Sequence, residues 1–239
     1  GVLLRMVTPL SVEGNGHRAA RGRSDAVNDL ALAPLAEIAL RTLAVSASAL
    51  AIAVAIGLPL GIALGRRRFR GRGAAVSLVN TAMGLPPVVV GLVVALLLWR
   101  SGPLGGLGLM YTPSAIVLAQ LLIALPLVVG LSHAAVGALG PEWHLQVRAL
   151  GLSGARSLWL LLRETRLGLL AAVIAALGGI LSEVGAVMMV GGNLEGETRV
   201  LTTGILMYTQ MGRFDEALAL SALLLGLTLV LTGTLTALQ

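Results

Sequence analysis

Five long runs of apolar residues, separated by short polar or arginine-rich segments, dominate the chain. They cover about residues 35–64, 74–99, 113–136, 167–190 and 217–238. Each is longer than the ~20 residues that a helix needs to cross about 30 Å of hydrocarbon. Because lipid offers no partner to backbone N–H and C=O groups, all five runs are predicted as helices rather than open strands.

Proline and glycine interrupt several of these runs. Pro59 lies near the end of the first run, Gly84-Leu85-Pro86-Pro87 divides the second, and Pro126 lies inside the third. Proline removes a backbone donor and clashes with the preceding turn, so we expect kinks at these points. Gly178, Gly179 and Gly185 give the fourth run a face of small residues, which favours close helix contacts.

The composition sets the class of protein. Apolar residues make up 56% of the chain and charged residues 12%, whereas soluble domains average about 45–50% and about 25%. The sequence therefore predicts an all-α integral membrane domain over residues 35–239, preceded by a polar, glycine- and arginine-containing leader over residues 1–34. The leader holds no apolar stretch typical of a signal peptide. Cysteine is absent, which excludes disulfides and thiolate chemistry.

Arginines mark which loops face the cytoplasm. They gather in the loops after the first and third runs, at positions 66, 67, 68, 70 and 72, and at 148, 156, 163 and 166. Since arginine-rich loops stay inside, these loops and the C-terminus are predicted to be cytoplasmic in a multi-pass inner-membrane protein. The leader would then lie outside, which Arg18, Arg21 and Arg23 oppose, but these arginines are further from a span.

Residues 138–166, which we call the docking segment, lie between the third and fourth runs. Trp143, Val147 and Leu150 recur at helical spacing, and a second short helix with an apolar side is predicted to begin near Ser153. Gly151, where the two helices would meet, is expected to adopt left-handed dihedral angles. A basic, amphipathic helix pair of this kind favours contact with a soluble partner.

The fourth run ends with an ionisable residue, Glu183. Such residues are costly in lipid and usually face the bundle interior or a water-filled path. A structural hydrogen bond to a neighbouring helix explains Glu183 equally well. The threonine-rich stretch that follows, residues 198–205, is predicted to form a short re-entrant or interfacial helix at the outer mouth. Met188 and Met189 are interpreted as packing residues.

Several stretches resemble the permease subunit of tungstate ABC importers. Residues 182–193 read SEVGAVMMVGGN, 198–203 read TRVLTT, 84–91 read GLPPVVVG and 101–105 read SGPLG. In the docking segment, RALGLS at 148–153 resembles the cytoplasmic signature loop of ABC permeases. Its Glu-Ala-Ala start and Leu-Pro ending are replaced here by Leu145-Gln146-Val147 and Arg163-Glu164. The resemblance covers about residues 34–239.

This resemblance implies a type I ABC importer permease with about five transmembrane helices and a two-helix coupling loop. It would form a homodimer, receive its anion from an extracytoplasmic substrate-binding protein and be driven by a separate ABC ATPase subunit. ATP and Mg would sit on that ATPase, and the permease would carry no cofactor, no metal and no catalytic residues. The ATPase-coupling residues would be Arg148, Ala149, Leu150, Gly151, Leu152 and Ser153.

Uncharged donors in or beside the spans suit a divalent oxyanion that must pass without being held tightly. The pathway or gate candidates are Gln120, Glu183, Asn193, Thr198, Thr202 and Thr203, and Ser132 and Asn80 are further donors. Glu183 would repel an anion if ionised, so we interpret it as a packing or gating residue. No arginine clamp lies inside a span, and Arg41 is expected to snorkel to the interface.

Alternative functions remain open at this point. Molybdate and sulfate permeases carry a similar pattern around Glu183, so the class of oxyanion is firmer than its identity. A passive channel or secondary transporter would favour internal repeats, and none is evident. A membrane enzyme would need an acid–base constellation, but His17, His133 and His144 are scattered. The high arginine content is a topology signal here and does not indicate nucleic-acid binding.

Overall fold

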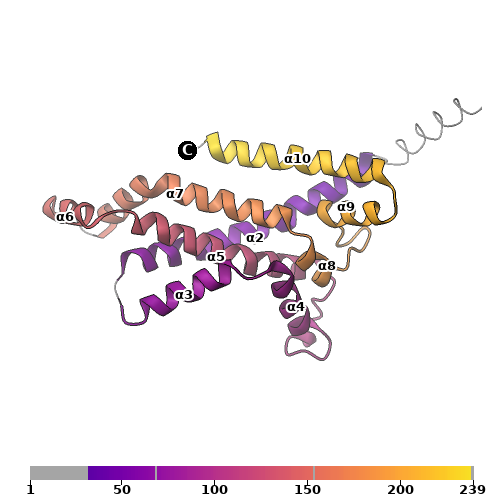
Figure 1. The fold of residues 1–239 in the computed structure, drawn as a ribbon, viewed down its shortest axis with the longest axis horizontal. Coiled ribbons are helices and arrows are strands. Elements are labelled where there is room, and N and C mark those ends of the chain that lie inside the picture. Colours follow the sequence, from indigo (N-terminus) through magenta and orange to yellow (C-terminus); the bar gives the residue numbers. More distant parts are fainter. Residues whose placement is uncertain (1–31, 68, 153, 238–239) are drawn as a thin grey trace, which may run out of the picture.

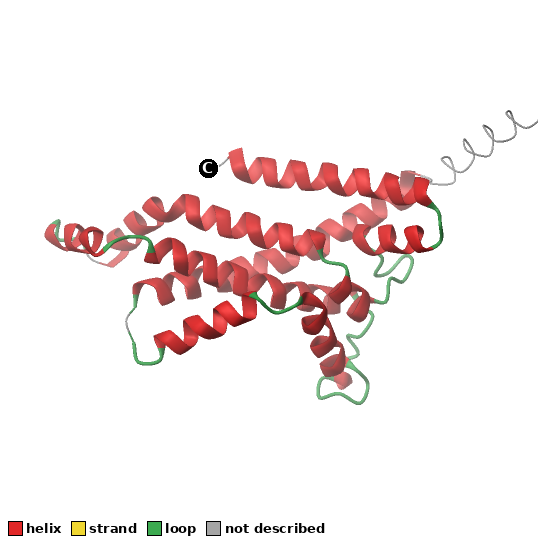
Figure 2. Ribbon diagram, in the orientation of Figure 1, coloured by secondary structure: helices red, strands yellow, loops and turns green. Residues whose placement is uncertain are grey.

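The computed structural model describes residues 32–67, 69–152 and 154–237, so almost all of the predicted leader, residues 1–34, lies outside it. In this described part the chain is helical with loops between, and no strand occurs (Figure 2). The elements are α2 (Leu32–Arg66), α3 (Arg72–Met83), α4 (Pro87–Leu98), η1 (Gly105–Leu107), α5 (Pro113–Gly137), α6 (Pro141–Ala149), α7 (Gly154–Ser182), α8 (Gly185–Gly191), α9 (Leu201–Gln210) and α10 (Phe214–Ala237). The all-α prediction is confirmed.

Helices α2 and α5 form the centre of the bundle because glycines let them approach closely. Gly57, Gly61 and Gly65 recur every four residues on the face of α2 that meets α5. A Cβ added at Gly61 would lie 2.6 Å from the carbonyl oxygen of Val129, and one at Gly57 would lie 2.8 Å from Val128. No side chain fits in these gaps, so the glycine stripe sets the spacing of the two central helices.

The second predicted span is not one helix. It consists of α3 and α4, which meet at 98° across the Gly84–Pro86 break. Pro86 and Pro87 lack the backbone N–H groups that would continue the ladder, so the chain restarts in a new direction. The described residues thus contain four helices long and apolar enough to cross a membrane, or five spans if the bent pair counts as one.

The fourth predicted span, residues 167–190, is also corrected. Helix α7 begins at Gly154 and runs without interruption to Ser182, and α8 starts only after the break at Glu183 and Val184. The second helix of the docking segment does begin near Ser153, as predicted, but the prediction that it is short and separate from the fourth span is wrong. Its residues form the first turns of α7, because no breaker separates Leu158 from the apolar run that follows.

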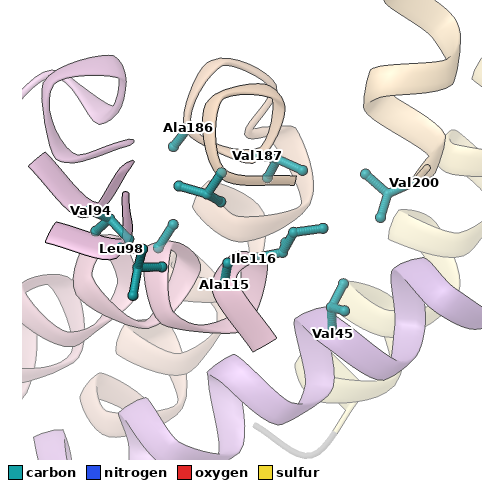
Figure 3. Close-up of a cluster of buried hydrophobic side chains, with 10 residues drawn as sticks. Val45, Val94, Leu98, Ala115, Ile116, Ala186, Val187 and Val200 are labelled. Atoms are coloured by element: carbon teal, nitrogen blue, oxygen red, sulfur yellow. The ribbon is translucent and has the colours of Figure 1, made fainter. Parts of the chain in front are cut away.

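Two buried clusters hold the bundle together. One joins α4, α5 and α8 through side chains that include Val94, Leu98, Ile116 and Val187, with Val45 and Val200 at its edge (Figure 3). The other joins α2, α5 and α7 through residues such as Val128 and Ile180. Within a membrane, close packing rather than removal from water stabilises such contacts, because lipid is as apolar as these side chains. These clusters fix α8 and α4 against the central helix.

The two ends of the bundle are clearly separated in space. The loop between α2 and α3 and helix α6 lie at one end, on the left of Figure 1, and α10 runs toward that side but ends near the middle of the view. The start of α2, α9 and the loop that precedes α9 lie at the other end. Loops predicted to be cytoplasmic thus gather at one end, which we call the α6 end. We call the opposite one the α9 end.

Candidate functional site

The turn after α6 has the geometry that the sequence predicts for Gly151. Its φ is +65°, in the left-handed region, and the N–H of Leu152 donates to the carbonyl of Val147 at 3.2 Å. A left-handed glycine, followed by a residue whose N–H donates to the carbonyl five residues earlier, is the Schellman motif that ends many helices. Gly154, with φ of +55°, starts α7. Two left-handed glycines within four residues therefore aim α6 away from the bundle (Figure 1).

Large apolar side chains in and beside this turn are exposed. Leu145, Leu150 and Trp159 are 64%, 69% and 62% exposed. The guanidinium of Arg163 lies 5.5 Å from the centre of the Trp159 ring, a distance at which a cation is attracted to the ring face. A cavity of about 420 Å³ adjoins the ring and is lined by Leu152, Ala155, Arg156, Trp159 and Leu160.

Of the six predicted coupling residues, the structure places Ala149, Leu150, Gly151 and Leu152 together in this turn. Ser153 and the side chain of Arg148 lie outside the described part. Exposed apolar surface rimmed by charged groups marks a site of protein contact. Trp159 was not among the predicted site residues, although its i, i+4 spacing with Arg163 could have indicated the pair.

At the α9 end, Glu183 occupies the break between α7 and α8. It is 9% exposed, and its Oε1 accepts a hydrogen bond from the backbone N–H of Ala186 at 2.8 Å. Its own carbonyl accepts from the hydroxyl of Thr202 at 3.0 Å. A carboxylate beside the first N–H groups of a helix is favourable. Glu183 therefore joins three elements, α7, α8 and α9, through hydrogen bonds.

The threonines of the predicted mouth bond to the backbone around them. Thr198 donates to the carbonyl of Gly191 at 2.5 Å and accepts from the N–H of Leu194 at 2.9 Å. The Thr203 hydroxyl accepts from the N–H of Val200 at 3.1 Å at the start of α9. The short helix predicted in this stretch is confirmed as α9. Its hydroxyls close a compact loop rather than pointing freely into a path.

Two further candidates have unpaired polar atoms. Gln120, on α5, is 3% exposed and its Oε1 has no hydrogen-bond partner among the described residues. Asn193 has φ of +54°, its Nδ2 donates to the sulfur of Met207 at 3.4 Å, and its Oδ1 is buried without a described partner. The hydroxyl groups of Ser46 and Ser132 are also buried and have no hydrogen-bond partner among the described residues.

Arg41 and Thr42 anchor the outer loop to α2, and sequence reasoning missed this role. Arg41 donates to the carbonyls of Gly196 at 2.7 Å and Arg199 at 3.2 Å, besides pairing with Glu37. The N–H of Leu201 donates to the Thr42 hydroxyl at 3.0 Å. Besides the predicted position near the end of a span, the structure shows that backbone carbonyls of a loop distant in sequence bind the Arg41 guanidinium. A lone arginine in an apolar run was the available signal.

Among the described residues, no group of three or more histidine, aspartate or glutamate side chains is placed to hold a metal ion. The polar groups that the structure brings together are neutral donors, backbone carbonyls and single carboxylates. Such groups suit packing, gating and weak anion contact.

Comparison with known sequences places these features in a family context. Residues 57–238, more than half of the chain, match the family described as "Binding-protein-dependent transport system inner membrane component". The matched region includes the end of α2 and all of α3 to α10, and therefore both the docking segment and the Glu183 break.

Individual relatives are similar over about two thirds of the chain. The chain is 42% identical over 158 residues to a "Probable anion ABC transporter permease protein" of Haloferax volcanii, with 64% of this chain and 68% of that protein covered. It is 41% identical over 157 residues to the "Tungstate uptake system permease protein TupB" of Peptoclostridium acidaminophilum, covering 66% and 69%. The Campylobacter jejuni protein of the same name is 35% identical over 148 residues, covering 62% of each chain.

Proposed function

Because the chain belongs to the family of binding-protein-dependent transport system inner membrane components, we propose that it is the permease subunit of an ATP-driven importer of tungstate. The observation that carries the choice of anion is the similarity to two permeases named for tungstate uptake, at 41% and 35% identity. Sulfate permeases are more distant, for example 28% identical in Salmonella typhimurium. Molybdate, a second tetrahedral oxyanion, is the main competitor.

Three partners follow from this proposal. An extracytoplasmic binding protein delivers the anion to the α9 end, and an ABC ATPase binds at the α6 end. A second copy of the permease completes the path along a two-fold axis. ATP and Mg belong to the ATPase, so the permease contributes a helix bundle with two states whose balance the anion and ATP shift.

The exposed turn after α6 supports the ATPase contact. Leu145, Leu150 and Trp159 would be covered by a groove in the ATPase, and the burial of this apolar surface favours binding. The left-handed Gly151 fixes the direction in which α6 leaves the bundle, so a push on α6 is transmitted to α5 and α7. The second half of the docking segment is continuous with α7, which gives the ATPase direct mechanical access to a spanning helix.

The path itself is proposed to bind the anion weakly. Gln120, Asn193 and the hydroxyls of Ser46 and Ser132 have atoms without protein partners, whereas Thr198, Thr202 and Thr203 hold the outer loop in place. A large, weakly hydrated dianion loses less on shedding water than a small one, and neutral donors suffice for it. Selectivity then resides in the binding protein, and Glu183 acts in packing or gating.

Uptake by reconstituted vesicles tests this function. The permease, its ATPase and its binding protein would be incorporated together, and internal tungsten measured by mass spectrometry. We expect ATP-dependent accumulation of tungstate, weaker competition by molybdate and poor competition by excess sulfate. Vesicles without the ATPase give the baseline.

Accumulation of an amino acid or a metal cation, with no response to tungstate or molybdate, would refute the oxyanion assignment. The family assignment would survive that result, because it rests on the sequence match over residues 57–238. ATP-independent uptake would instead favour a passive channel and would overturn the importer proposal.

A further inference from the structure

We propose that a groove at the α6 end of the bundle, between α2 and α7, is a binding site for an anionic phospholipid of the cytoplasmic leaflet. The groove has a volume of about 610 Å³ and is lined by Leu58, Pro59, Ile62, Ala63, Arg66, Arg67, Leu158 and Leu162. It is separate from the cavity beside Trp159 and from the α9 end. The proposal depends on membrane insertion but not on which anion the protein transports.

Along the axis of α2 the groove lining changes from apolar side chains to arginines, just as a phospholipid changes from acyl chains to a phosphate headgroup. On α2, two rows at i, i+4 and i+8 each pass from apolar side chains to a terminal arginine. One row is Leu58, Ile62 and Arg66, and the other is Pro59, Ala63 and Arg67. On α7, Leu158 and Leu162 face the same groove and are 38% and 37% exposed. Apolar walls that end in two cations match acyl chains that end in a phosphate.

The two arginines have no partner that would neutralise them. Neither the Arg66 nor the Arg67 side chain forms an ion pair or hydrogen bond with another described residue, and both are exposed. Arg72, in contrast, donates from Nε to the carbonyl of Leu64 at 3.0 Å. Both arginines line the same groove, and a phosphate there can accept charge-assisted hydrogen bonds from guanidinium groups.

The glycine face of α2 packs against α5, and this contact explains why α7 does not close the groove on another face of α2. Gly57, Gly61 and Gly65 face α5, and the close approach that they permit holds α2 against that helix. The face bearing Leu58 and Ile62 points elsewhere, and the described side chains of α7 only partly cover it. The groove therefore begins in the hydrocarbon region and ends at the last turn of α2, where lipid headgroups lie. Basic pockets at this depth bind anionic lipid headgroups.

Lipid binding to the purified full-length permease in mild detergent tests the proposal, with native mass spectrometry as the readout. The probes are phosphatidylglycerol, which is anionic, and phosphatidylcholine, which has no net charge. Each arginine near an anionic lipid is worth about fivefold in affinity, so we expect phosphatidylglycerol to bind about 25-fold more tightly. In the double variant Arg66→Gln, Arg67→Gln, this preference should fall to near parity.

Arg70→Gln is the matched control, because Arg70 is an exposed arginine of the same loop that does not line the groove. It should change the preference by less than about twofold. Leu162→Trp tests the apolar wall with both arginines in place, and filling the groove should lower phosphatidylglycerol affinity about tenfold. Glycerol 1-phosphate, a headgroup without chains, should not displace the lipid.

Four results would overturn the proposal. The first is equal binding of the two lipids to the wild type. The second is a loss of the phosphatidylglycerol preference in Arg70→Gln as large as in the double variant. The third is full displacement of the lipid by glycerol 1-phosphate, which would indicate a site for free phosphate. The fourth is a change in oligomer mass in Leu162→Trp without loss of lipid, which indicates that the groove is a contact between two copies. Because Arg66 and Arg67 are exposed, their replacement is not expected to prevent folding.

Discussion

At the α6 end, large apolar side chains such as Leu150 and Trp159 are exposed, whereas the α9 end, which also exposes Met211 and Phe214, buries several of its polar groups. Thr198, Thr203 and Leu201 at that end are 0% exposed, and their hydroxyl or backbone groups are hydrogen-bonded within the chain. One end thus keeps unfilled apolar surface for a partner. The other end joins its segments to one another through buried hydrogen bonds.

This difference fits two separate roles for the two ends of the proposed permease. In the proposed importer, a surface that associates with a soluble ATPase needs exposed apolar groups and a defined direction, and the left-handed Gly151 supports the latter. A mouth that must open and close needs discrete links that can break together. Arg41, Thr42 and Glu183 supply such links, because each joins segments that are far apart in the sequence.

The largest expected effect concerns the orientation of the two ends. The chain has no cysteine, so single cysteines can be introduced without background labelling. In right-side-out vesicles, Arg70→Cys at the α6 end should be shielded from an impermeant thiol reagent, and Glu197→Cys at the α9 end should be labelled. Labelling is expected to be all or none for each position.

The reverse labelling pattern would place the α6 end outside. It would remove the docking segment from the reach of a cytoplasmic ATPase and refute the roles proposed for the two ends. Gly106→Cys, in the other exposed loop predicted to lie outside, serves as a positive control for reagent access.

The next prediction tests the docking turn. Gly151→Asp should lower ATP-dependent uptake at least tenfold, since it adds a charge at the proposed ATPase contact and a side chain at a φ of +65°. Membrane insertion should stay normal, because a Cβ at Gly151 would meet no atom within 4 Å. The measurement is uptake in vesicles together with the amount of ATPase that co-purifies.

Gly151→Asn is the matched control, since asparagine tolerates left-handed dihedral angles and carries no charge. It should keep most of the uptake. Full uptake by Gly151→Asp would sink the docking role of this turn, and equal loss in both variants would assign the effect to backbone geometry rather than to charge.

A smaller effect is expected from the clamp at the opposite end. Arg41→Gln removes the charged donor to the carbonyls of Gly196 and Arg199. Hydrogen bonds to charged groups contribute about 1.5–3 kcal/mol, so we expect a loss of about 2 kcal/mol and a fall in Tm of about 5 °C. Thermal unfolding in detergent measures it.

Arg100→Gln is the control for this clamp. Arg100 is an exposed arginine near the α9 end and makes no hydrogen bond with another described residue. Its replacement should leave Tm unchanged within about 1 °C. A similar Tm shift in both variants would show that net charge, and not the carbonyl contacts of Arg41, sets the stability of the loop.

The smallest effect is expected at Glu183. Glu183→Gln keeps an oxygen that accepts from the Ala186 N–H, so the loss of stability should be about 0.5 kcal/mol. Glu183→Ala removes the acceptor and should cost about 1 kcal/mol, as lost helix caps do. Both variants should retain uptake in proportion to folded protein if Glu183 serves packing rather than gating. Loss of uptake in Glu183→Gln with unchanged Tm would make this residue part of the anion path.

The sequence by itself determined the class of protein and the approximate limits of three long helices. Apolar runs of sufficient length can only be helices in lipid, so the all-α bundle and the positions of α2, α5 and α10 could be predicted. Local rules also predicted the left-handed Gly151 and the Gly84–Pro86 break, because backbone sterics at glycine and proline depend on neighbouring residues alone. The family resemblance came from short motifs for the same reason.

The tertiary structure decided what the polar side chains do. Thr198 and Thr203 look like path donors in the sequence but bond to nearby backbone. Arg41 looks like an interface residue but binds carbonyls 155 and 158 positions away. The continuity of α7 from Gly154 also needed the structure. A hydrogen bond or a bend angle depends on which helices pack together, and that packing is a property of the whole chain rather than of any local pattern.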